Sequence, residues 1–233
     1  MFKFFYVKRI TIAIDGPSAS GKSTIAKSLA KTLGYIYVDS GAMYRAVTLY
    51  FLENNVPIDD ADAVSEALAD ISIRFTRNER GNCTILNDRD VESEIRQMRV
   101  SEYVSQVAAT KAVRTEMVKQ QHEMGKNKGI VMDGRDIGTV VFPDAEVKIF
   151  VTADIEERAK RRYAELKKKG NEVSFEEILQ NLRERDRIDS TRAASPLRKA
   201  DDAVEIDNTH LSLEEQLELA QAIVEEKTGE KVS

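Results

Sequence analysis

Apolar and polar residues follow one another along the first forty positions in a pattern that predicts a strand, a helix and a second strand. Residues 10–14 form a short β-branched apolar run that stops at Gly16-Pro17, as a buried strand does before a turn. Beyond the turn, apolar side chains recur at every fourth position, at Ile25, Leu29 and Leu33. Gly34 then predicts the C-terminal cap of a helix, and residues 35–38 predict the next strand. This order is typical of a parallel sheet.

Later segments repeat the same succession of buried strands and helices. Three more apolar runs predict strands, at residues 129–132, 147–151 and 204–206. Helical periodicity covers the intervals, at about residues 42–54, 100–126, 156–169 and 174–187. Ser174 and Ser212 each stand three residues before a glutamate, which is the spacing of a capping box and predicts two helix starts. We therefore expect an α/β protein with a central parallel sheet between two layers of helices, which makes three layers.

One segment departs from this pattern. Residues 71–95 alternate apolar and polar side chains, turn at residues 78–82 and resume as an alternating run at residues 83–86. Alternation on both sides of a turn predicts an antiparallel ribbon of two or three strands. We therefore expect an inserted subdomain at about residues 60–100, within a core formed by residues 1–59 and 101–233.

The composition of the 233 residues fits one large domain, or one domain with an insertion. Hydrophobic residues make up 42% of the chain, which is too many for general disorder. The single cysteine excludes an intramolecular disulfide, as fits a reducing compartment. Lys8 and Arg9 interrupt the apolar N-terminal residues before a signal-peptide core is reached, and no run approaches the ~20 apolar residues that span a bilayer. We expect a soluble, cytoplasmic protein with no membrane partner.

Charge is distributed unevenly along the chain. The net charge of −5 gives no support for binding to a nucleic-acid polymer. Residues 158–199, however, hold 13 Lys or Arg against 7 Asp or Glu, whereas residues 200–233 hold 2 against 10. The basic segment is either a solvated helix face or a surface that meets an anion. No apolar surface stripe stands out, so we expect a monomer.

The strongest local signal is a phosphate-binding loop between the first strand and the first helix. Residues 16–23 read GPSASGKS and match the pattern G-x-x-x-x-G-K-[ST]. The glycines let successive backbone N–H groups point at phosphate oxygens, Lys22 reaches the β- and γ-phosphates, and the Ser23 hydroxyl is placed to ligate Mg²⁺. We expect ATP to bind at the loop and the helix start, which comprise Gly16, Pro17, Ser18, Ala19, Ser20, Gly21, Lys22, Ser23 and Thr24.

The loop alone predicts that a nucleotide binds but does not predict which reaction, if any, follows. A GTPase needs the base-reading pattern Asn-Lys-x-Asp, and residues 127–130 (NKGI) lack its aspartate. The strand at residues 130–132 ends in Asp133, as does the second motif of P-loop ATPases. A motor ATPase usually needs more sequence than this chain has. Two classes stay open at this point, a phosphotransferase and a non-catalytic nucleotide switch or motor module.

Three further loops place arginines beside acidic residues, at positions where an α/β sheet binds ligands. They are residues 39–45 (DSGAMYR), 133–139 (DGRDIGT) and 183–192 (RERDRIDSTR). Each loop alone is equally well explained as an ion-pair cluster. Together, in a chain with a phosphate-binding loop, they favour a site for an anionic acceptor. Asp15 precedes the phosphate-binding loop, where it either assists the metal through water or has a structural role. Asp39, at the acceptor loop, has a similar ambiguity.

At these residues the chain closely resembles bacterial cytidylate (CMP) kinase. The matching blocks are DGPSASGKST, VDSGAMYR, DGRDIGTVVFPDA and RERDRIDSTRAASPL, in the same order, and they extend from about residue 10 to the last helix. The resemblance implies the P-loop nucleoside monophosphate kinase fold, with a monophosphate-binding insertion and a mobile helical lid at about residues 155–190. It also implies transfer of the γ-phosphoryl group of ATP to CMP or dCMP, assisted by Mg²⁺.

The resemblance also assigns roles to the acceptor side. It implies that the CMP phosphate is held by Arg45, Arg135 and Arg192. It implies that cytosine is read by Ser105, Arg114 and Asp136, and that the sugar is contacted by Arg185 and Asp189. The Ser40 hydroxyl is a weaker expectation beside the phosphate. The roles suit the chemistry, because a carboxylate accepts the cytosine N4 amino group whereas uracil would present a carbonyl to it.

Catalysis in such an enzyme rests on electrostatics, so we expect no dedicated nucleophile. Lys22 and a lid arginine would stabilise the charge on the transferring phosphoryl group. The basic helix offers Arg158, Arg161 and Arg162 for this role, and the sequence does not choose among them. The nearest alternative is a related small kinase that takes UMP or another acceptor.

Overall fold

A five-stranded parallel sheet forms the centre of the computed structural model, which describes residues 9–78, 81–168, 170 and 172–232. Its strands are β1 (Thr11–Asp15), β2 (Ile36–Asp39), β6 (Ile130–Gly134), β7 (Val147–Thr152) and β8 (Val204–Asp207). Their order across the sheet is β2-β6-β1-β7-β8, and every neighbouring pair is parallel. All five predicted strands are therefore confirmed, each within two residues of its expected ends.

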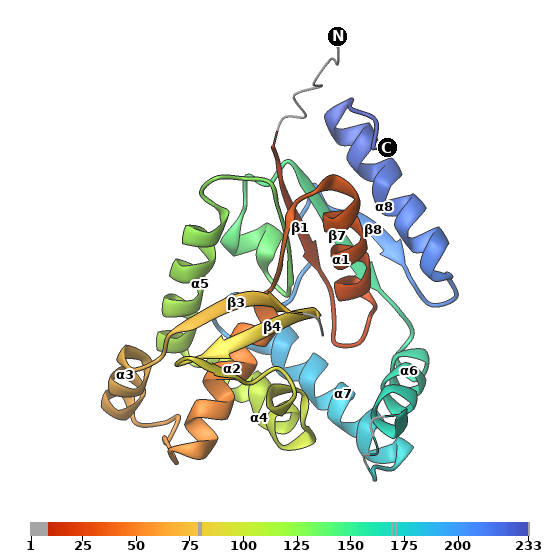
Figure 1. Cartoon of the computed structure of the whole chain (residues 1–233). Coiled ribbons are helices and arrows are strands. Elements are labelled where there is room, and N and C mark those ends of the chain that lie inside the picture. Colours follow the sequence, from red (N-terminus) through yellow and green to blue (C-terminus); the bar gives the residue numbers. More distant parts are fainter. Residues whose placement is uncertain (1–8, 79–80, 169, 171, 233) are drawn as a thin grey trace.

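Helices cover both faces of the sheet, which confirms the three-layer α/β class (Figure 1). On one face, α1 (Lys22–Leu33) and α8 (Leu213–Thr228) pack their apolar sides against β1 and β7 in one hydrophobic cluster. On the other face lie α2 (Ser40–Glu53), α5 (Lys111–Gly125) and a single turn of π-helix, η2 (Ile137–Val141). Gly34 ends α1 with a φ of 66°, as predicted from the sequence.

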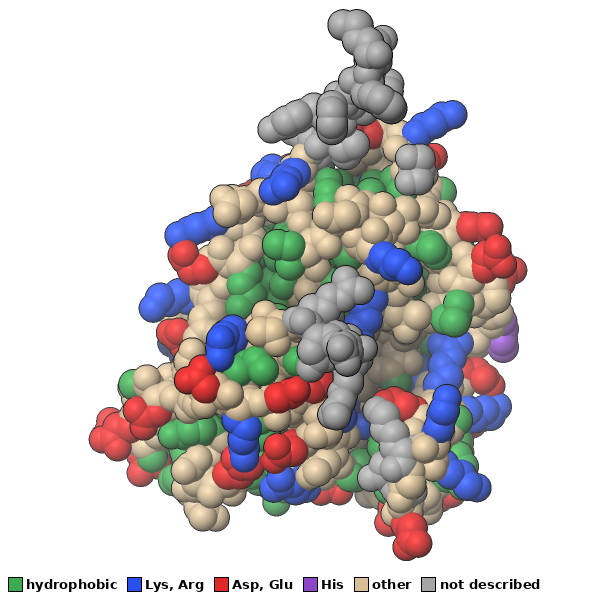
Figure 2. All heavy atoms as spheres, in the orientation of Figure 1, with side chains coloured by type: hydrophobic (Ala, Val, Ile, Leu, Met, Phe, Trp, Pro, Cys, Tyr) green, Lys and Arg blue, Asp and Glu red, His purple; other side chains and the backbone are tan. Residues whose placement is uncertain are grey.

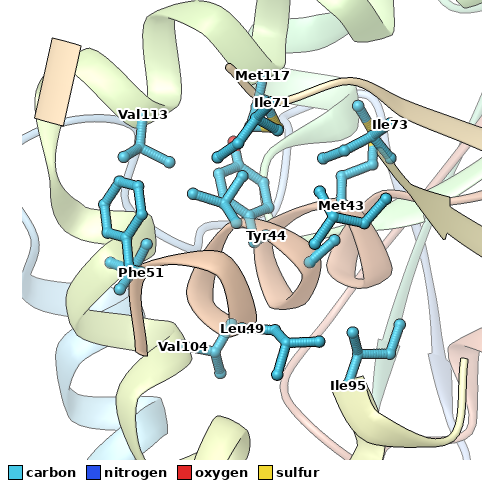
Figure 3. Packing of buried hydrophobic residues seen from close by; sticks show 14 of the residues in the cluster. Met43, Tyr44, Leu49, Phe51, Ile71, Ile73, Ile95, Val104, Val113 and Met117 are labelled. Carbon is cyan, nitrogen blue, oxygen red and sulfur yellow. The ribbon is translucent and has the colours of Figure 1, made fainter. Parts of the chain in front are cut away.

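The expected antiparallel ribbon is present and has three strands, β3 (Ile73–Asn78), β4 (Gly81–Leu86) and β5 (Arg89–Asp90). Around it lie three short helices, α3 (Ala61–Ala69), the 3₁₀ turn η1 (Glu94–Arg96) and α4 (Met98–Ala109). Apolar residues of this segment, including Ile71, Ile73 and Ile95, share one hydrophobic cluster with α2 and α5 (Figure 3). The insertion is thus packed onto the helical layer of the core and has no separate core of its own.

The long helix expected over residues 100–126 is wrong, because the structure divides it into α4 and α5. Thr110 stands between them with extended dihedral angles, φ −67° and ψ 123°. Residues of both helices belong to the cluster around α2, and the break lets each helix turn an apolar side toward it. Neither proline nor glycine marks the position, so the sequence carries no local signal for the break.

A helical hairpin projects from the carboxyl end of the sheet, the end at which the insertion also lies (Figure 1). It consists of α6 (Ile155–Lys168) and α7 (Phe175–Thr191), which pack together around a small cluster of their own that includes Ala159, Leu166 and Leu182. Both predicted capping boxes, at Ser174 and Ser212, are present. The helix that begins after Ser174 continues to Thr191, four residues beyond its predicted end, and so carries Asp189. Within the described part of the chain, no helix combines the length and the apolar character that crossing a bilayer requires.

Candidate active site

A cavity of about 1060 Å³ opens where the strands of the central sheet end. Its walls are formed by the loops after β1, β2 and β6, by η1 and α4 on one side, and by α6 and α7 on the other. Figure 2 shows this face of the molecule hollowed between the half that holds the sheet and the helices below it, with Lys and Arg side chains at the rim. Open α/β sheets bind their ligands at the carboxyl ends of their strands, so this is the expected place for a site.

The phosphate-binding loop has the backbone that the sequence predicts. It joins β1 to α1, and Gly21 caps the helix with a φ of 94°, a conformation that L side chains rarely adopt. A Cβ atom at Gly21 would lie 2.1 Å from the Asn208 side-chain nitrogen, and one at Gly16 would lie 2.1 Å from the Val151 carbonyl oxygen. Both glycines are therefore required by close packing behind the loop.

Lys22, the loop lysine, is buried and donates to the Pro17 carbonyl oxygen over 2.9 Å. Its pKa is lowered to about 7, chiefly by burial and then by the positive charge of Arg135, although the charge of Asp133 acts in the opposite direction. The amine thus sits in an environment that disfavours its charge while no phosphate is near.

Side-chain oxygens that could coordinate a metal ion lie close to Lys22. The Ser23 hydroxyl donates to Asp133 over 2.7 Å, and the Tyr37 hydroxyl donates to the other oxygen of the same carboxylate over 2.7 Å. Burial raises the pKa of Asp133, and the nearby charge of Asp39 raises it further. The described residues contain no group of three or more His, Cys, Asp or Glu side chains able to hold a metal. A hydroxyl and one carboxylate beside a phosphate site nevertheless suit Mg²⁺, which takes most of its other ligands from phosphates and water.

The two ambiguous aspartates have structural contacts. Asp15 accepts hydrogen bonds from the backbone N–H groups of Ile137 and Gly138, each over 2.8 Å, and so fixes the loop that follows β6. Burial raises the pKa of Asp15 to about 7. Asp39 caps α2 by accepting from the Ala42 N–H over 2.9 Å. Asp15 therefore positions the loop after β6, and Asp39 positions the start of α2; both of these segments line the cavity.

Positive side chains crowd the acceptor side of the cavity. The Arg45 guanidinium, from α2, is buried and donates to the Ser101 hydroxyl over 2.9 Å and to the Ile95 carbonyl oxygen over 3.2 Å. Burial lowers the pKa of Arg45 well below its usual range, and the positive charge of Arg185 lowers it further. Burial, followed by the charge of Arg135, lowers the pKa of Arg185 to about 10. Guanidinium groups in such a crowd are stabilised by an anion that binds among them.

The three residues expected to read a base all line the cavity. Arg114, from α5, donates to one oxygen of the Asp136 carboxylate, and both side chains are buried. The other oxygen of Asp136 is 3.8 Å from Arg192. Ser105, on α4, is also buried and lines the same cavity. The break between α4 and α5 is what brings Ser105 and Arg114 to one wall.

Asp189, from α7, also lines the cavity. Its carboxylate accepts from Arg135 over 2.8 Å and lies 3.8 Å from Arg192. Burial would raise the pKa of Asp189, but the neighbouring arginines, Arg135 first, hold it below its usual range. Among the residues that the structure describes, three buried donor nitrogens on cavity-lining arginines have no hydrogen-bond partner, namely Arg114 Nε, Arg185 Nε and Arg192 Nη2. Unpaired donors of this kind indicate a polar ligand.

Ser40, the weaker expectation, is buried at the start of α2 and lines the cavity. Its hydroxyl donates to the Asp133 carbonyl oxygen over 2.7 Å. The proton is therefore already in use, and the oxygen can serve a ligand only as an acceptor while this bond holds.

The three arginines of α6 have different surroundings. Arg162 lines the cavity and donates to Glu165 over 2.8 Å and to the Arg96 carbonyl oxygen over 3.3 Å. Arg158 donates to the Ser18 carbonyl oxygen over 3.0 Å and pairs with Asp186. Arg161 instead donates to the carbonyl oxygens of residues 208 and 209. Arg158 and Arg161 therefore brace the phosphate loop and its surroundings, and Arg162 faces the ligand space.

Sequence reasoning missed three residues of this site. Tyr37 orients Asp133, Asn208 donates to the Ser20 carbonyl oxygen over 2.6 Å behind the phosphate loop, and Arg96 lines the cavity from η1. Asn208 directly follows the end of β8, so its position in the sheet is a usable signal, whereas Tyr37 is the second residue of β2 and has no such signal. Arg96 has no such signal, because it comes from the insertion.

A family model and several curated proteins that match this chain all carry the same description. A family model described as cytidylate kinase matches residues 12–226. The chain is 60% identical to a cytidylate kinase of Phocaeicola vulgatus over 215 residues, which cover 90% of this chain and 94% of the relative. It is 55% identical to a cytidylate kinase of Flavobacterium psychrophilum over 223 residues, which cover 94% and 99% of the two chains. A cytidylate kinase of Bacillus velezensis is 51% identical over 221 residues, which cover 95% and 99%.

Proposed function

The chain belongs to the cytidylate kinase family, and from this premise we propose how its residues transfer the γ-phosphoryl group of ATP to CMP or dCMP. The products are ADP and CDP or dCDP. The observation that carries the proposal is the crowd of buried arginines that shares one cavity with the loop lysine, with two of those arginines around Asp136. Such a site has an excess of positive charge, which two substrates that bear phosphate groups would neutralise.

On the donor side, the backbone N–H groups of residues 16–23 would hold the ATP phosphates at the start of α1. Lys22 would leave the Pro17 carbonyl oxygen and bind the β- and γ-phosphates, and Thr24 lines the cavity beside it. Ser23 and Asp133 would hold Mg²⁺, which when bound neutralises charge on the phosphates. Asp133 is already oriented for this by the Tyr37 hydroxyl.

On the acceptor side, we assign the CMP phosphate to Arg45, Arg135 and Arg192. Planar guanidinium groups suit this task because they bind phosphate oxygens in pairs. We assign the sugar to Arg185 and Asp189, which both line the cavity. The unpaired Nε of Arg185 supports this assignment, since that buried donor needs a polar partner.

For the base, we propose that Asp136 accepts the cytosine N4 amino group with the oxygen that Arg114 does not occupy. Arg114 and the Ser105 hydroxyl would donate to the acceptors N3 and O2 of the ring. Uracil would place a carbonyl oxygen against the carboxylate, and two facing acceptors repel each other. Asp136 therefore selects cytosine by charge and by hydrogen bonding together.

In the transfer step, an oxygen of the CMP phosphate attacks the γ-phosphorus and the bond from that phosphorus to the β,γ-bridging oxygen breaks. We propose that α6 and α7 act as the lid and that Arg162 stabilises the charge on the transferring group. Arg162 is the α6 arginine that lines the cavity, whereas Arg158 and Arg161 hold backbone around the phosphate loop. We further propose that the protein acts as a monomer, since none of these steps calls for a residue from a second copy.

The test is ADP formation from ATP and Mg²⁺ with CMP, dCMP, UMP, AMP, GMP and dTMP supplied separately. We expect strong turnover with CMP and dCMP alone, and its loss when a chelator removes Mg²⁺. Equal turnover with UMP would overturn the role of Asp136 in base selection. ATP binding without phosphoryl transfer to any acceptor would favour a nucleotide switch instead.

A further inference from the structure

Arg96 lines the cavity but has no place in the mechanism above. It is the last residue of η1, at the point where the chain leaves the antiparallel insertion and enters α4. Its side chain is 27% exposed and binds two carboxylates that also line the cavity. Burial alone would lower the pKa of Arg96, but the charges of Asp39 and Glu92 outweigh burial and raise the pKa above its usual value. The guanidinium is therefore held firmly in its charged form.

The contacts of Arg96 connect the insertion to the core. Its Nη2 donates to Asp39 over 2.8 Å and to Glu92 over 2.9 Å. Glu92 in turn accepts from the Thr84 hydroxyl on β4 over 2.7 Å. On the other side, Asp39 caps α2 through the Ala42 N–H, and α2 carries Arg45. A continuous chain of polar contacts thus runs from the insertion sheet to the helix that supplies a phosphate-binding arginine.

The same residue is also a contact point for the α6–α7 hairpin. Arg162 donates to the backbone carbonyl oxygen of Arg96 over 3.3 Å. The side chain of Arg96 ties that stretch of backbone to the core, and so fixes the position of the oxygen that Arg162 contacts. The core, the insertion and α6 therefore meet at one residue on the wall of the cavity.

We propose that Arg96 is a positioning residue that couples the insertion and the α6–α7 hairpin to the N-terminus of α2, and so sets the place of Arg45 and Arg162 around the acceptor phosphate. The inference deepens the proposed function and rests on it. Arg96 acts through Asp39, since the pKa of that carboxylate, which burial alone would raise, is held below its usual range chiefly by Arg96. Groups in one such network couple strongly.

Arg89 provides a matched control. It also joins the insertion to α2, since it pairs with Glu53 at the other end of that helix over 2.7 Å. This pair lies at the surface, with the Arg89 side chain 49% exposed, and Arg89 is not part of the cavity wall. Arg89→Ala therefore removes an ion pair between the same two segments without changing the site.

The experiment compares KM and kcat for CMP and for ATP in the unmodified protein, Arg96→Ala, Arg96→Lys, Asp39→Asn, the double variant Arg96→Ala with Asp39→Asn, and Arg89→Ala. Asparagine keeps the cap on α2 and removes the charge. We expect Arg96→Ala and Asp39→Asn each to raise KM for CMP by about tenfold, within the usual range of coupling for charges in one network. The double variant should be no worse than Arg96→Ala, and Arg96→Lys should recover part of the loss. KM for ATP should stay within about twofold, as should every parameter of Arg89→Ala.

The proposal is overturned if Arg96→Ala leaves KM for CMP unchanged, or if Arg89→Ala raises it equally. It is also overturned if the effects of Arg96→Ala and Asp39→Asn multiply, because a multiplied loss would mean that Arg96 acts without Asp39. Thermal unfolding of each variant shows that a changed KM does not come from a loss of folded protein. Absence of CMP turnover in the unmodified protein would instead overturn the proposed function, and this inference with it.

Discussion

The donor side and the acceptor side of the cavity are built in different ways. The donor side is one short stretch of chain, residues 16–24, and we expect it to hold phosphate mainly with backbone N–H groups and one lysine. The acceptor side collects side chains from α2, α4, α5, the loop after β6, and α7. Here we propose that the binding groups are side chains, most of them charged, and that the backbone serves to place them.

This difference has an energetic consequence. Backbone N–H groups carry only partial charges, so a loop made of them is stable without its ligand. Buried arginines that face one another repel, as the lowered pKa values of Arg45 and Arg185 indicate, with burial as the larger cause. The acceptor side therefore gives up stability in the free protein for affinity in the complex, which is a common arrangement at functional sites.

The variant Arg45→Met is expected to affect the acceptor side strongly and the donor side hardly at all. It keeps an aliphatic chain and removes the charge. We expect kcat/KM for CMP to fall by roughly a hundredfold or more, as when one partner of a buried charge pair is removed. KM for ATP should stay nearly unchanged. The free protein should keep its melting temperature or gain a few degrees, because charge repulsion is relieved. Steady-state kinetics and thermal unfolding measure the two effects.

A marked loss of stability in Arg45→Met, parallel to the loss of activity, would contradict the comparison. It would mean that the bonds from Arg45 to Ser101 and to the Ile95 carbonyl oxygen stabilise the free protein more than the crowded charges destabilise it.

A second prediction concerns pH on the donor side. The pKa of Lys22 in the free protein is about 7, so above this pH the amine is largely neutral and must take up a proton when the phosphates of ATP bind. ATP affinity should therefore fall by up to about tenfold for each pH unit above 7, and stay nearly constant below it. Titration calorimetry in buffers of different ionisation heat measures the proton uptake directly.

The control is Lys22→Arg, because arginine stays charged throughout this range. Its ATP affinity, whatever its absolute value, should lose the pH dependence. If the unmodified protein takes up no proton on binding ATP at pH 8, the burial of Lys22 does not set its charge and this account of the donor side fails.

The smallest expected effect comes from the two capping boxes. Ser174 starts α7, which carries Arg185 and Asp189 of the acceptor side, and Ser212 starts α8, which packs against α1. Ser174→Ala and Ser212→Ala should each cost about 1 kcal/mol of unfolding free energy, measured in urea. Neither should change either KM by more than about twofold. A large rise in KM for CMP in Ser174→Ala alone would show that the acceptor side depends on the first turn of α7.

Most of the fold follows from the sequence because its signals are local. Apolar runs predicted all five strands of the central sheet, and the spacing of serine and glutamate predicted the capped starts of α7 and α8. The break at Thr110 was missed, since it is imposed by packing of α4 and α5 on α2, and a β-branched residue at a helix junction has no local signature. Tertiary contacts override local preference at such positions.

The role of the donor side could be predicted from its own residues, whereas the roles of the acceptor side could not. The phosphate-binding loop is contiguous, so its role could be derived from the residues themselves. The roles of the acceptor residues came from resemblance to a family, since no spacing predicts that Arg114 and Asp136 pair across 22 positions. The contact between Arg96 and Asp39, 57 positions apart, had neither source and required the structure.

We propose that the Asp136 carboxylate, held by arginines, selects the acceptor base. The ratio of kcat/KM for CMP to that for UMP in Asp136→Asn tests this selection. An asparagine amide can turn to donate to the uracil carbonyl, which the carboxylate cannot do. We predict that the ratio falls by about a hundredfold or more relative to the unmodified protein, while KM for ATP is unchanged. A ratio that stays the same would contradict the account, because base selection would then lie elsewhere in the cavity.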